Sequence, residues 1–311
     1  MADGGKIQRA MSLSGAVHLA APHTWPAAVL PALLGSALAC ADGTPLRPWI
    51  ALAVLAVSVL LQSAINTLND WRDFVSGLDS AENCTDQSDA ALIYDGCTPR
   101  GALALGLAFL LCAALLGGVL VVCCGAALLI YGALALLAIV LYVLPKRAFS
   151  ALPFGELLSG LAMGLVLTAA AYHAQRGCFS PALLWQSLPP VLTIGCIMLV
   201  NNTSDIEKDT AGGRRTLPVC IGRSASEKLL RTLLAAAALG VTAILLFRFP
   251  DGTAAAAVMF FGLLTNANVR GLFLQPVTPE RRRDSMGGIL AAHKWITAGY
   301  LAGVVIFTLA N

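Results

Sequence analysis

Nine apolar stretches follow one another along the chain, separated by short polar connections. A helix that crosses a bilayer needs about 20 mostly apolar residues, because each residue adds only about 1.5 Å along the axis. The nine stretches lie at about residues 25–42, 48–68, 101–121, 123–144, 152–174, 183–203, 229–249, 253–274 and 287–309. Asn266 and Asn268 interrupt the eighth. This pattern predicts an all-α polytopic membrane protein with nine transmembrane helices, forming one domain over residues 1–311.

The overall composition agrees with this pattern. The chain is 58% hydrophobic and 12% charged, with a mean hydropathy of +0.77, which excludes an ordinary soluble domain. Its nine cysteines show no metal-ligand spacing. A net charge of +3 indicates no particular partner, so we expect the lipid bilayer as the surroundings and neither a nucleic acid nor a protein partner.

The basic residues orient the predicted helices. If the N-terminus is cytoplasmic, most Lys and Arg fall in loops on the cytoplasmic side, and only Arg47, Arg176 and Arg248 fall in loops on the other side. Cytoplasmic loops of membrane proteins carry this excess of positive charge. We therefore expect a cell-membrane protein whose second and sixth helices end at the cytoplasmic face.

A first polar cluster stands at the cytoplasmic end of the second stretch. Asn66 and Asp70 are four residues apart, and so are Asn69 and Asp73. On a continuing helix, residues four apart share a face, so these side chains form a ladder of oxygens.

A second cluster repeats this arrangement after the sixth stretch. Asn201, Asp205 and Asp209 follow one another at intervals of one helical turn, with Asn202 beside the first. More than half of the 17 acidic residues fall in the loops that follow these two stretches. A solvated helix end is the simpler interpretation of one such cluster, but two matched clusters at the ends of apolar helices favour a site.

The donor types indicate which ligand such a site would take. Neighbouring carboxylates repel one another, and a cation between them relieves the repulsion. Oxygen donors without His or Cys suit a hard ion such as Mg²⁺, which is commonly shared with substrate phosphates. Flanking basic residues and apolar helices then predict a substrate with a diphosphate head and a hydrocarbon tail.

Three further segments have two interpretations each. The polar loop at residues 80–99 is either a cytoplasmic lid over the site or a disordered linker, and its apolar piece at residues 90–94 suits a short helix or strand. Lys146 and Arg147 are either membrane anchors or anion ligands. The run from Arg281 to Arg283 is predicted to set topology and contact lipid headgroups.

These residues together resemble the UbiA superfamily of intramembrane aromatic prenyltransferases. The motifs that carry the resemblance cover nearly the whole chain: Asn69, Asp70 and Asp73 with Gly77 and Asp79; Tyr142 and Lys146 as Tyr-x-x-x-Lys; and Asp205 and Asp209 followed by Gly213, Arg214, Arg215 and Thr216. Within the superfamily the chain is most similar to the menaquinone branch, which prenylates 1,4-dihydroxy-2-naphthoate. That branch carries a Gly-Pro and an Arg in the lid, where this chain has the acidic run at residues 82–89.

The resemblance implies a fold, a reaction and residue roles. It implies nine helices around a central cavity, and Mg²⁺-dependent transfer of a polyprenyl group from polyprenyl diphosphate to an aromatic acceptor. The implied metal ligands are Asn69, Asp73, Asp205 and Asp209. The implied catalytic residues are Lys146, Tyr142 and Asp70. The candidate substrate-binding residues are Asn66, Arg72, Asn201, Asn202, Lys208, Arg214 and Arg215.

Other functions remain open at this point. The acceptor could be of the 4-hydroxybenzoate or homogentisate type. A CDP-alcohol phosphotransferase also uses membrane Asp residues, but in one contiguous motif. A cation-coupled transporter would hold its ligands near the bilayer midplane, whereas these clusters lie at helix ends.

Overall fold

The computed structural model describes residues 12–80, 91–143 and 148–311, and this part of the chain contains helices and no strand. Six helical segments are long and apolar enough to cross a membrane, and two further helix pairs qualify if each bent pair counts as one span. The shorter apolar helix α6 completes the set. Each of the nine predicted stretches therefore coincides with a helix or a helix group, which confirms the all-α membrane fold.

The helices have the following bounds. In chain order they are α1 (Leu13–Ala20), α2 (Pro26–Ala41), α3 (Pro48–Val75), α4 (Ala91–Tyr94), α5 (Pro99–Cys124), α6 (Leu128–Val143), α7 (Gly155–Ser159), the π-helical turn η4 (Gly160–Val166), α8 (Leu167–Arg176), α9 (Leu183–Gln186), α10 (Leu188–Ser204), α11 (Ile206–Ala211), α12 (Leu217–Ile221), α13 (Arg223–Arg248), α14 (Ala254–Thr265), α15 (Ala267–Leu274) and α16 (Arg282–Ala310). Short 3₁₀ turns lie at Pro22–Thr24 (η1), Phe149–Ala151 (η3), Pro250–Gly252 (η5) and Pro279–Arg281 (η6).

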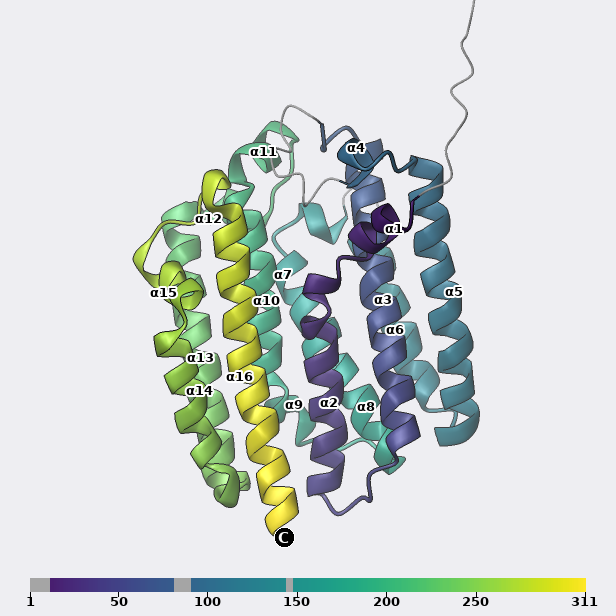
Figure 1. Cartoon of the computed structure of the whole chain (residues 1–311), viewed down its shortest axis with the longest axis vertical. Helices are drawn as coiled ribbons and strands as arrows, with labels where there is room; N and C mark the ends of the chain where they lie inside the picture. The colour runs from purple at the N-terminus through teal and green to yellow at the C-terminus, as the bar shows by residue number, and fades with distance from the viewer. Residues whose placement is uncertain (1–11, 81–90, 144–147) are drawn as a thin grey trace, which may run out of the picture.

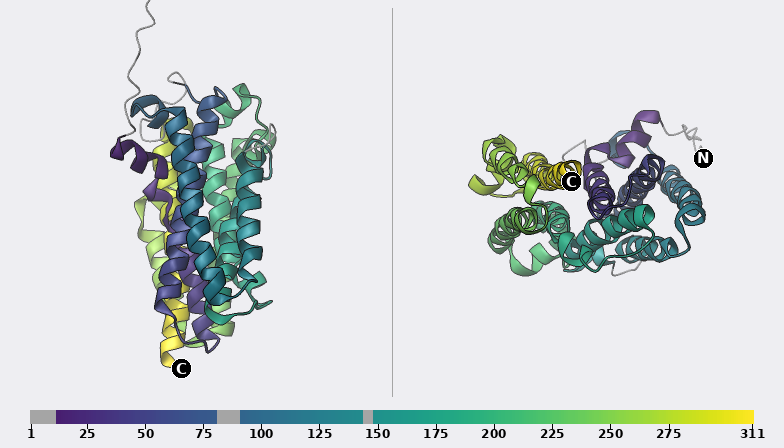
Figure 2. Two further views of the ribbon diagram at one scale, coloured as in Figure 1. Left: turned by 90° about the vertical axis from the view of Figure 1, so that its right-hand side faces the viewer. Right: turned by 90° about the horizontal axis from the view of Figure 1, so that it is seen from below.

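The long helices run side by side in an elongated bundle (Figures 1 and 2). The small elements α1, α4 and α11 lie together at one end of it, at the top in Figure 1. We call this the polar end, because both acidic clusters lie there. The predicted short piece in the 80–99 loop is the helix α4, while residues 81–90 of that loop lie outside the described residues.

One bend between helices has a local cause in the sequence. The segment Pro250–Thr265 meets α15 at 66°. Asn266 causes this break, because its side-chain oxygen accepts hydrogen bonds from the backbone N–H groups of Asn268 and Val269, both at 3.1 Å, and so caps a new helix. The interruption seen in the eighth stretch is thus a capped corner between two helices.

Hydrogen bonds around Asp42 join helices at the opposite end of the bundle. Asp42, which follows α2, accepts hydrogen bonds from Tyr172 of α8 at 2.6 Å and from Arg248 of α13 at 2.7 Å. Arg176 also donates to the Asp42 backbone oxygen. These contacts join three helices at the end remote from the acidic clusters.

The helices α2 and α8 pack closely against each other. Gly35 of α2 faces α8 so closely that a Cβ placed there would lie 2.2 Å from the Thr168 backbone oxygen. Small residues let membrane helices approach to this distance. The packed helices leave one large interior space, which is described next.

Candidate active site

A cavity of about 1950 Å³ extends into the bundle from the polar end. Most of its walls are apolar side chains of α3, α5, α6, η4 and α10, whereas the residues near its mouth are polar. The predicted site residues that line it are Asn66, Asn69, Asp70, Asp73, Tyr142, Asn201, Asn202, Asp205, Lys208 and Arg214. The structure therefore brings the two sequence clusters to one cavity mouth.

The first cluster stays on one face of a continuous helix, as the spacing predicts, because α3 extends to Val75. The side-chain amide of Asn69 donates to the Asp73 carboxylate at 3.2 Å. The other Asp73 oxygen faces Arg72 Nη1 at 3.4 Å, and Arg72 also donates to Ser150 Oγ at 3.1 Å. Arg72 thus supports Asp73 and is not among the described residues that line the cavity.

Asn66 has a different environment. Its Nδ2 donates to Thr24 Oγ1 at 2.9 Å and to the Ala20 backbone oxygen at 3.2 Å, and its Oδ1 accepts from Gln62 at 3.2 Å. Asn66 lines the cavity, but its amide joins α3 to the segment between α1 and α2.

The second cluster departs from the predicted continuous helix. Asp205 ends α10 with φ −103° and ψ 14°, and a new short helix, α11, carries Lys208 and Asp209. Because the chain turns here, Asp209 becomes almost fully buried and is not among the described cavity-lining residues, while Asn201 and Asp205 remain at the cavity. The prediction of one unbroken ladder over Asn201, Asp205 and Asp209 was therefore wrong.

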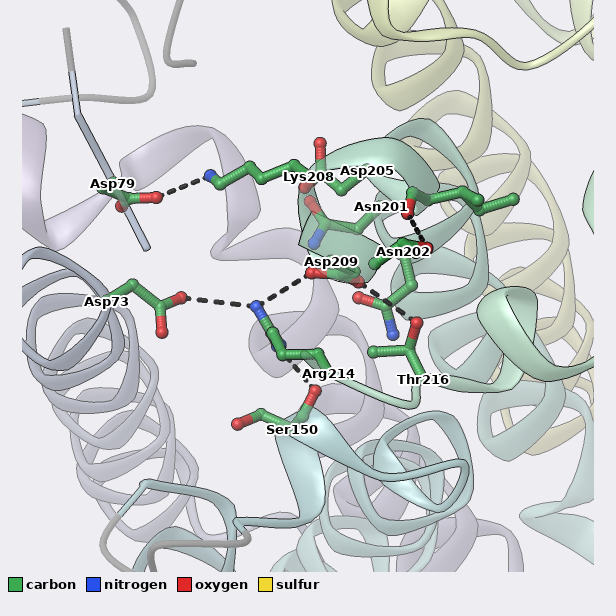
Figure 3. A network of polar contacts seen from close by, with 12 residues as sticks. Asp73, Asp79, Ser150, Asn201, Asn202, Asp205, Lys208, Asp209, Arg214 and Thr216 are labelled. Atoms are coloured by element: carbon green, nitrogen blue, oxygen red, sulfur yellow. Dashed lines mark hydrogen bonds and ion pairs between the residues drawn. The ribbon is translucent and has the colours of Figure 1, made fainter. Parts of the chain in front are cut away.

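Arg214 connects the two clusters (Figure 3). Its Nη1 lies 3.2 Å from Asp209 Oδ1 and 3.8 Å from Asp73 Oδ2, and its Nη2 donates to the Ser150 backbone oxygen at 2.6 Å. Gly213, with φ +71°, turns the chain so that Arg214 points back at these carboxylates. Arg215, in contrast, has an exposed side chain and is not among the described residues at the cavity.

Burial changes the acid strength of Asp209. Desolvation raises its pKa to about 6, although the neighbouring Arg214 guanidinium acts in the opposite direction. Its second oxygen accepts a hydrogen bond from Thr216 Oγ1 at 3.1 Å (Figure 3). Arg214 and Thr216 hold the buried Asp209 carboxylate in place. The Asp209 carboxylate in turn fixes the position of the Arg214 guanidinium.

Two further contacts join helices around the cavity mouth. Lys208 Nζ lies 2.5 Å from Asp79 Oδ1, so α11 is joined to the segment that follows α3. Asn202 donates to Glu156 Oε1 of α7 at 2.8 Å, which places it as a support between α10 and α7.

Arg282, the first residue of α16, is a site residue that the sequence analysis missed. Its Nη1 lies 2.7 Å from Asp205 Oδ2, its Nη2 donates to Asn201 Oδ1 at 2.8 Å, and it lines the cavity. The run from Arg281 to Arg283 was predicted to set topology and contact lipid headgroups. The four-residue spacing of Arg282 and Met286, which puts both on one helix face, was the only available signal.

Tyr142 of α6 reaches the cavity from another side. Its hydroxyl donates to the Met198 sulfur of α10 at 3.7 Å. Its predicted partner Lys146, together with Arg147, lies outside the described residues.

The donor set suits a hard divalent cation in its chemistry. The buried Asn69 Oδ1 has no hydrogen-bond partner within the described part of the chain, and it lies one helical turn from the Asp73 carboxylate. Within the same described residues, no group of three or more His, Cys, Asp or Glu side chains is close enough to hold a metal. Arg214, Lys208 and Arg282 instead neutralise the carboxylates, so a metal would replace these cations.

Comparison with known proteins agrees with the fold. The model of the UbiA prenyltransferase family matches residues 28–308. The 1,4-dihydroxy-2-naphthoate octaprenyltransferase of Bacillus subtilis (strain 168) is 32% identical over 230 residues, which cover 73% of this chain and 72% of that protein.

Solved structures share the architecture at low sequence identity. A UbiA homolog from Archaeoglobus fulgidus, bound to GPP and Mg²⁺, aligns with a TM-score of 0.61 at 19% identity, covering 94% of this chain and 99% of that one. The apo structure of a UbiA homolog from Aeropyrum pernix K1 gives a TM-score of 0.63 at 19% identity, covering 88% and 96%. At these identities the likeness shows a common fold.

Proposed function

This chain belongs to the UbiA prenyltransferase family, and from that membership we propose that it transfers a polyprenyl group from polyprenyl diphosphate to 1,4-dihydroxy-2-naphthoate, in menaquinone biosynthesis. The Bacillus subtilis relative, named for that acceptor, supports the choice. The observation that carries the proposal is the meeting of two oxygen-rich clusters, joined by Arg214, at the mouth of one long apolar cavity.

The diphosphate of the donor belongs at the polar end. Asn69, Asp73, Asp205 and Asp209 would hold Mg²⁺, which when bound offsets the negative charge of the diphosphate and makes it a better leaving group. Lys208 pairs with Asp79, and Arg214 lies between Asp73 and Asp209, so both cations can contact phosphate oxygens directly. Asp70 supports this cluster from α3, whose face it shares with Asn66.

The hydrocarbon tail belongs in the apolar part of the cavity. In the reaction the bond between the allylic carbon and the diphosphate oxygen breaks, and the electron pair leaves with the diphosphate. Arg214 and Lys208 stabilise the charge that develops on it. The aromatic carbon of the acceptor then supplies the electron pair for the new carbon–carbon bond. The bond from that carbon to its former substituent breaks, which releases a proton, or CO₂ if the carbon carried the carboxylate, and its electron pair restores the aromatic ring.

The cavity walls protect the allylic cation. Side chains such as Leu136, Ile139 and Val166 exclude water that would otherwise capture it. Tyr142 lies on this boundary between polar and apolar lining, and its electron-rich ring can face a nearby cation. Lys146, one turn beyond Tyr142 in the sequence, is proposed as a further diphosphate contact.

We place the enzyme in the cell membrane with this site facing the cytoplasm. The supporting observation is the concentration of Lys and Arg in loops at the polar end. The family and the apolar helices show a multi-pass membrane protein. The loop at residues 80–99, next to the cavity mouth, is proposed as a lid.

The deciding experiment is a transfer assay with a panel of acceptors. Purified protein with Mg²⁺ and labelled polyprenyl diphosphate should prenylate dihydroxynaphthoate in preference to 4-hydroxybenzoate and homogentisate. If the protein prefers another acceptor, the proposed prenyl transfer stands and the proposed acceptor is wrong. Release of diphosphate with no prenylated product from any acceptor would contradict the proposal.

A further inference from the structure

Arg282 occupies a position that helix energetics do not favour. It is the first residue of α16, where the positive end of the helix dipole disfavours a cation. Its guanidinium donates to Asp205 Oδ2 at 2.7 Å and to Asn201 Oδ1 at 2.8 Å, and these two hydrogen bonds offset this cost. Arg282 therefore holds both its Nη groups against a pair of oxygens at the cavity, which is the arrangement by which arginine binds a carboxylate.

The surface of α16 below Arg282 is apolar. Met286 and Leu290 follow at intervals of one turn on the same face, and both line the cavity. Gly287 lies beside them, and a Cβ placed there would have its nearest neighbour, Asn268 Nδ2, at 4.0 Å. Gly287 therefore adds no side-chain bulk to this part of the cavity lining.

The adjoining wall of the cavity comes from α10, which packs against α16. Ile197 and Met198 of α10 line the same cavity. Met198 also accepts the hydrogen bond from Tyr142, the residue placed beside the nascent allylic cation. Thioether side chains make favourable contacts with aromatic rings. We call the part of the cavity lined by Ile197, Met198, Met286, Gly287 and Leu290 the α10–α16 slot.

We propose that Arg282 binds the carboxylate of the aromatic acceptor, with the ring lying in the α10–α16 slot. This inference rests on the proposed function and names the residue that selects a carboxylated acceptor. The acceptor carboxylate takes the place of Asp205 at the guanidinium, so one negative charge exchanges for another. The ring then lies between Arg282 and Tyr142, on the side where the allylic cation forms.

The division of cations at the cavity mouth supports this assignment. Arg214 and Lys208 pair with Asp73, Asp79 and Asp209, on the α3 side, where the diphosphate is placed. Arg282 comes from α16 and pairs with Asp205. The ring of an aromatic carboxylate needs space next to the cation that binds its carboxylate, and the α10–α16 slot lies next to Arg282. A diphosphate attached to a flexible tail has no such requirement.

Equilibrium binding of two fluorescent probes tests the inference without turnover. The probes are 1-hydroxy-2-naphthoate and 1-naphthol, which differ only in the carboxylate. Arg282→Gln should weaken the binding of 1-hydroxy-2-naphthoate at least about tenfold, which is the usual effect of losing a charged hydrogen-bonded pair. The binding of 1-naphthol should be unchanged. Arg282→Lys keeps the positive charge but lacks the paired N–H donors of a guanidinium. Its affinity for 1-hydroxy-2-naphthoate should lie between those of Arg282→Gln and wild type.

Arg281→Gln is the matched control, because Arg281 is the preceding residue and contacts the Pro276 backbone oxygen instead of the cavity cluster. It should bind both probes as wild type does. In transfer assays, Arg282→Gln should raise KM for the acceptor and leave KM for the donor unchanged.

Two outcomes would overturn the inference. One is equal weakening of both probes by Arg282→Gln or a raised donor KM, either of which would assign Arg282 to folding or to the diphosphate. The other is equal wild-type affinity for the two probes. Transfer by the wild type to an acceptor that lacks a carboxylate would then preserve the proposed prenyl transfer but not the proposed acceptor, whereas absence of transfer to every acceptor would contradict the proposed function itself.

Discussion

At the scale of single residues, the site depends on how its charges are paired. Arg214 contacts a carboxylate from each cluster, and the Asp209–Thr216 contact fixes one of its partners. A guanidinium with this many fixed contacts is organised before the substrate arrives. Such preorganisation is what makes an electrostatic contact effective in a transition state.

Arg214→Ala should therefore reduce kcat/KM by roughly 100-fold, the usual loss when one preorganised charge contact is removed. It should also weaken donor binding, because Asp73 and Asp209 lose their shared cation. Steady-state transfer assays measure both effects. Arg215→Ala also removes one positive charge, but from the next residue, whose side chain is exposed. This variant should therefore lose far less activity. Equal losses in the two variants would contradict the bridging role.

The proposed metal ligands make a separate prediction. Asp73→Asn and Asp205→Asn each remove one charge from the oxygen donors while preserving shape. Each should abolish Mg²⁺-dependent transfer and reduce the increase in melting temperature that Mg²⁺ and a diphosphate analogue produce together, because ligand binding stabilises the folded state by mass action.

The control for this pair is Asp251→Asn, at the opposite end of the bundle, where the carboxylate contacts Asn311. It should retain transfer and the Mg²⁺-dependent increase in melting temperature. Wild-type turnover by Asp73→Asn or Asp205→Asn would show that the carboxylates do not hold a metal.

At the scale of helices, glycines decide how closely the elements pack. Gly35→Ala places a Cβ 2.2 Å from the Thr168 backbone oxygen and 2.8 Å from the Ala171 Cβ, so α2 and α8 must separate. Overpacking of this kind costs about 1–3 kcal/mol. Thermal unfolding in detergent, followed by loss of helical circular dichroism, should show a lower melting temperature.

Gly117→Ala in α5 is the control for that experiment. A Cβ there meets nothing within 4 Å, so the substitution adds helix propensity without a clash. Its melting temperature should equal or exceed that of wild type. A Gly35→Ala protein as stable as wild type would show that the α2–α8 contact is not tightly packed.

The helices illustrate what hydropathy can and cannot predict. Long apolar stretches gave the helices directly, because a bilayer-spanning segment must satisfy its backbone hydrogen bonds internally. The break at Asp205 was not predicted, since four-residue spacing looks the same whether the helix continues or turns. Arg282 was missed for a related reason: its contact with Asp205 depends on how α16 packs against α10, which local spacing does not encode.

At the scale of the whole molecule, the cavity reaches far from the polar end. Its lining runs along α3 from Asp73 to Val54, a distance of about 28 Å at 1.5 Å per residue. That length approaches the roughly 30 Å hydrocarbon thickness of a bilayer. A short donor such as geranyl diphosphate would leave most of this apolar space unfilled, so the cavity favours a long polyprenyl tail.

Gly132, near the start of α6, lines the cavity toward the end remote from Asp73. A Cβ at Gly132 meets nothing within 4 Å, so a side chain added there begins in open space. Gly132→Phe should therefore shorten the usable cavity and leave the polar end intact. We expect kcat/KM to fall for long polyprenyl diphosphates and to remain unchanged for geranyl diphosphate, as measured in competition assays with donors of different length.

Leu239→Phe provides the control for this prediction, because Leu239 is 63% exposed on α13 and does not line the cavity within the described residues. It should keep the wild-type order of donor preference. If Gly132→Phe also kept that order, the tail would have to leave the bundle before it reaches α6, and the length of the cavity would not select the donor. A change confined to long donors would show that the cavity itself selects tail length, independently of the residues that bind the diphosphate.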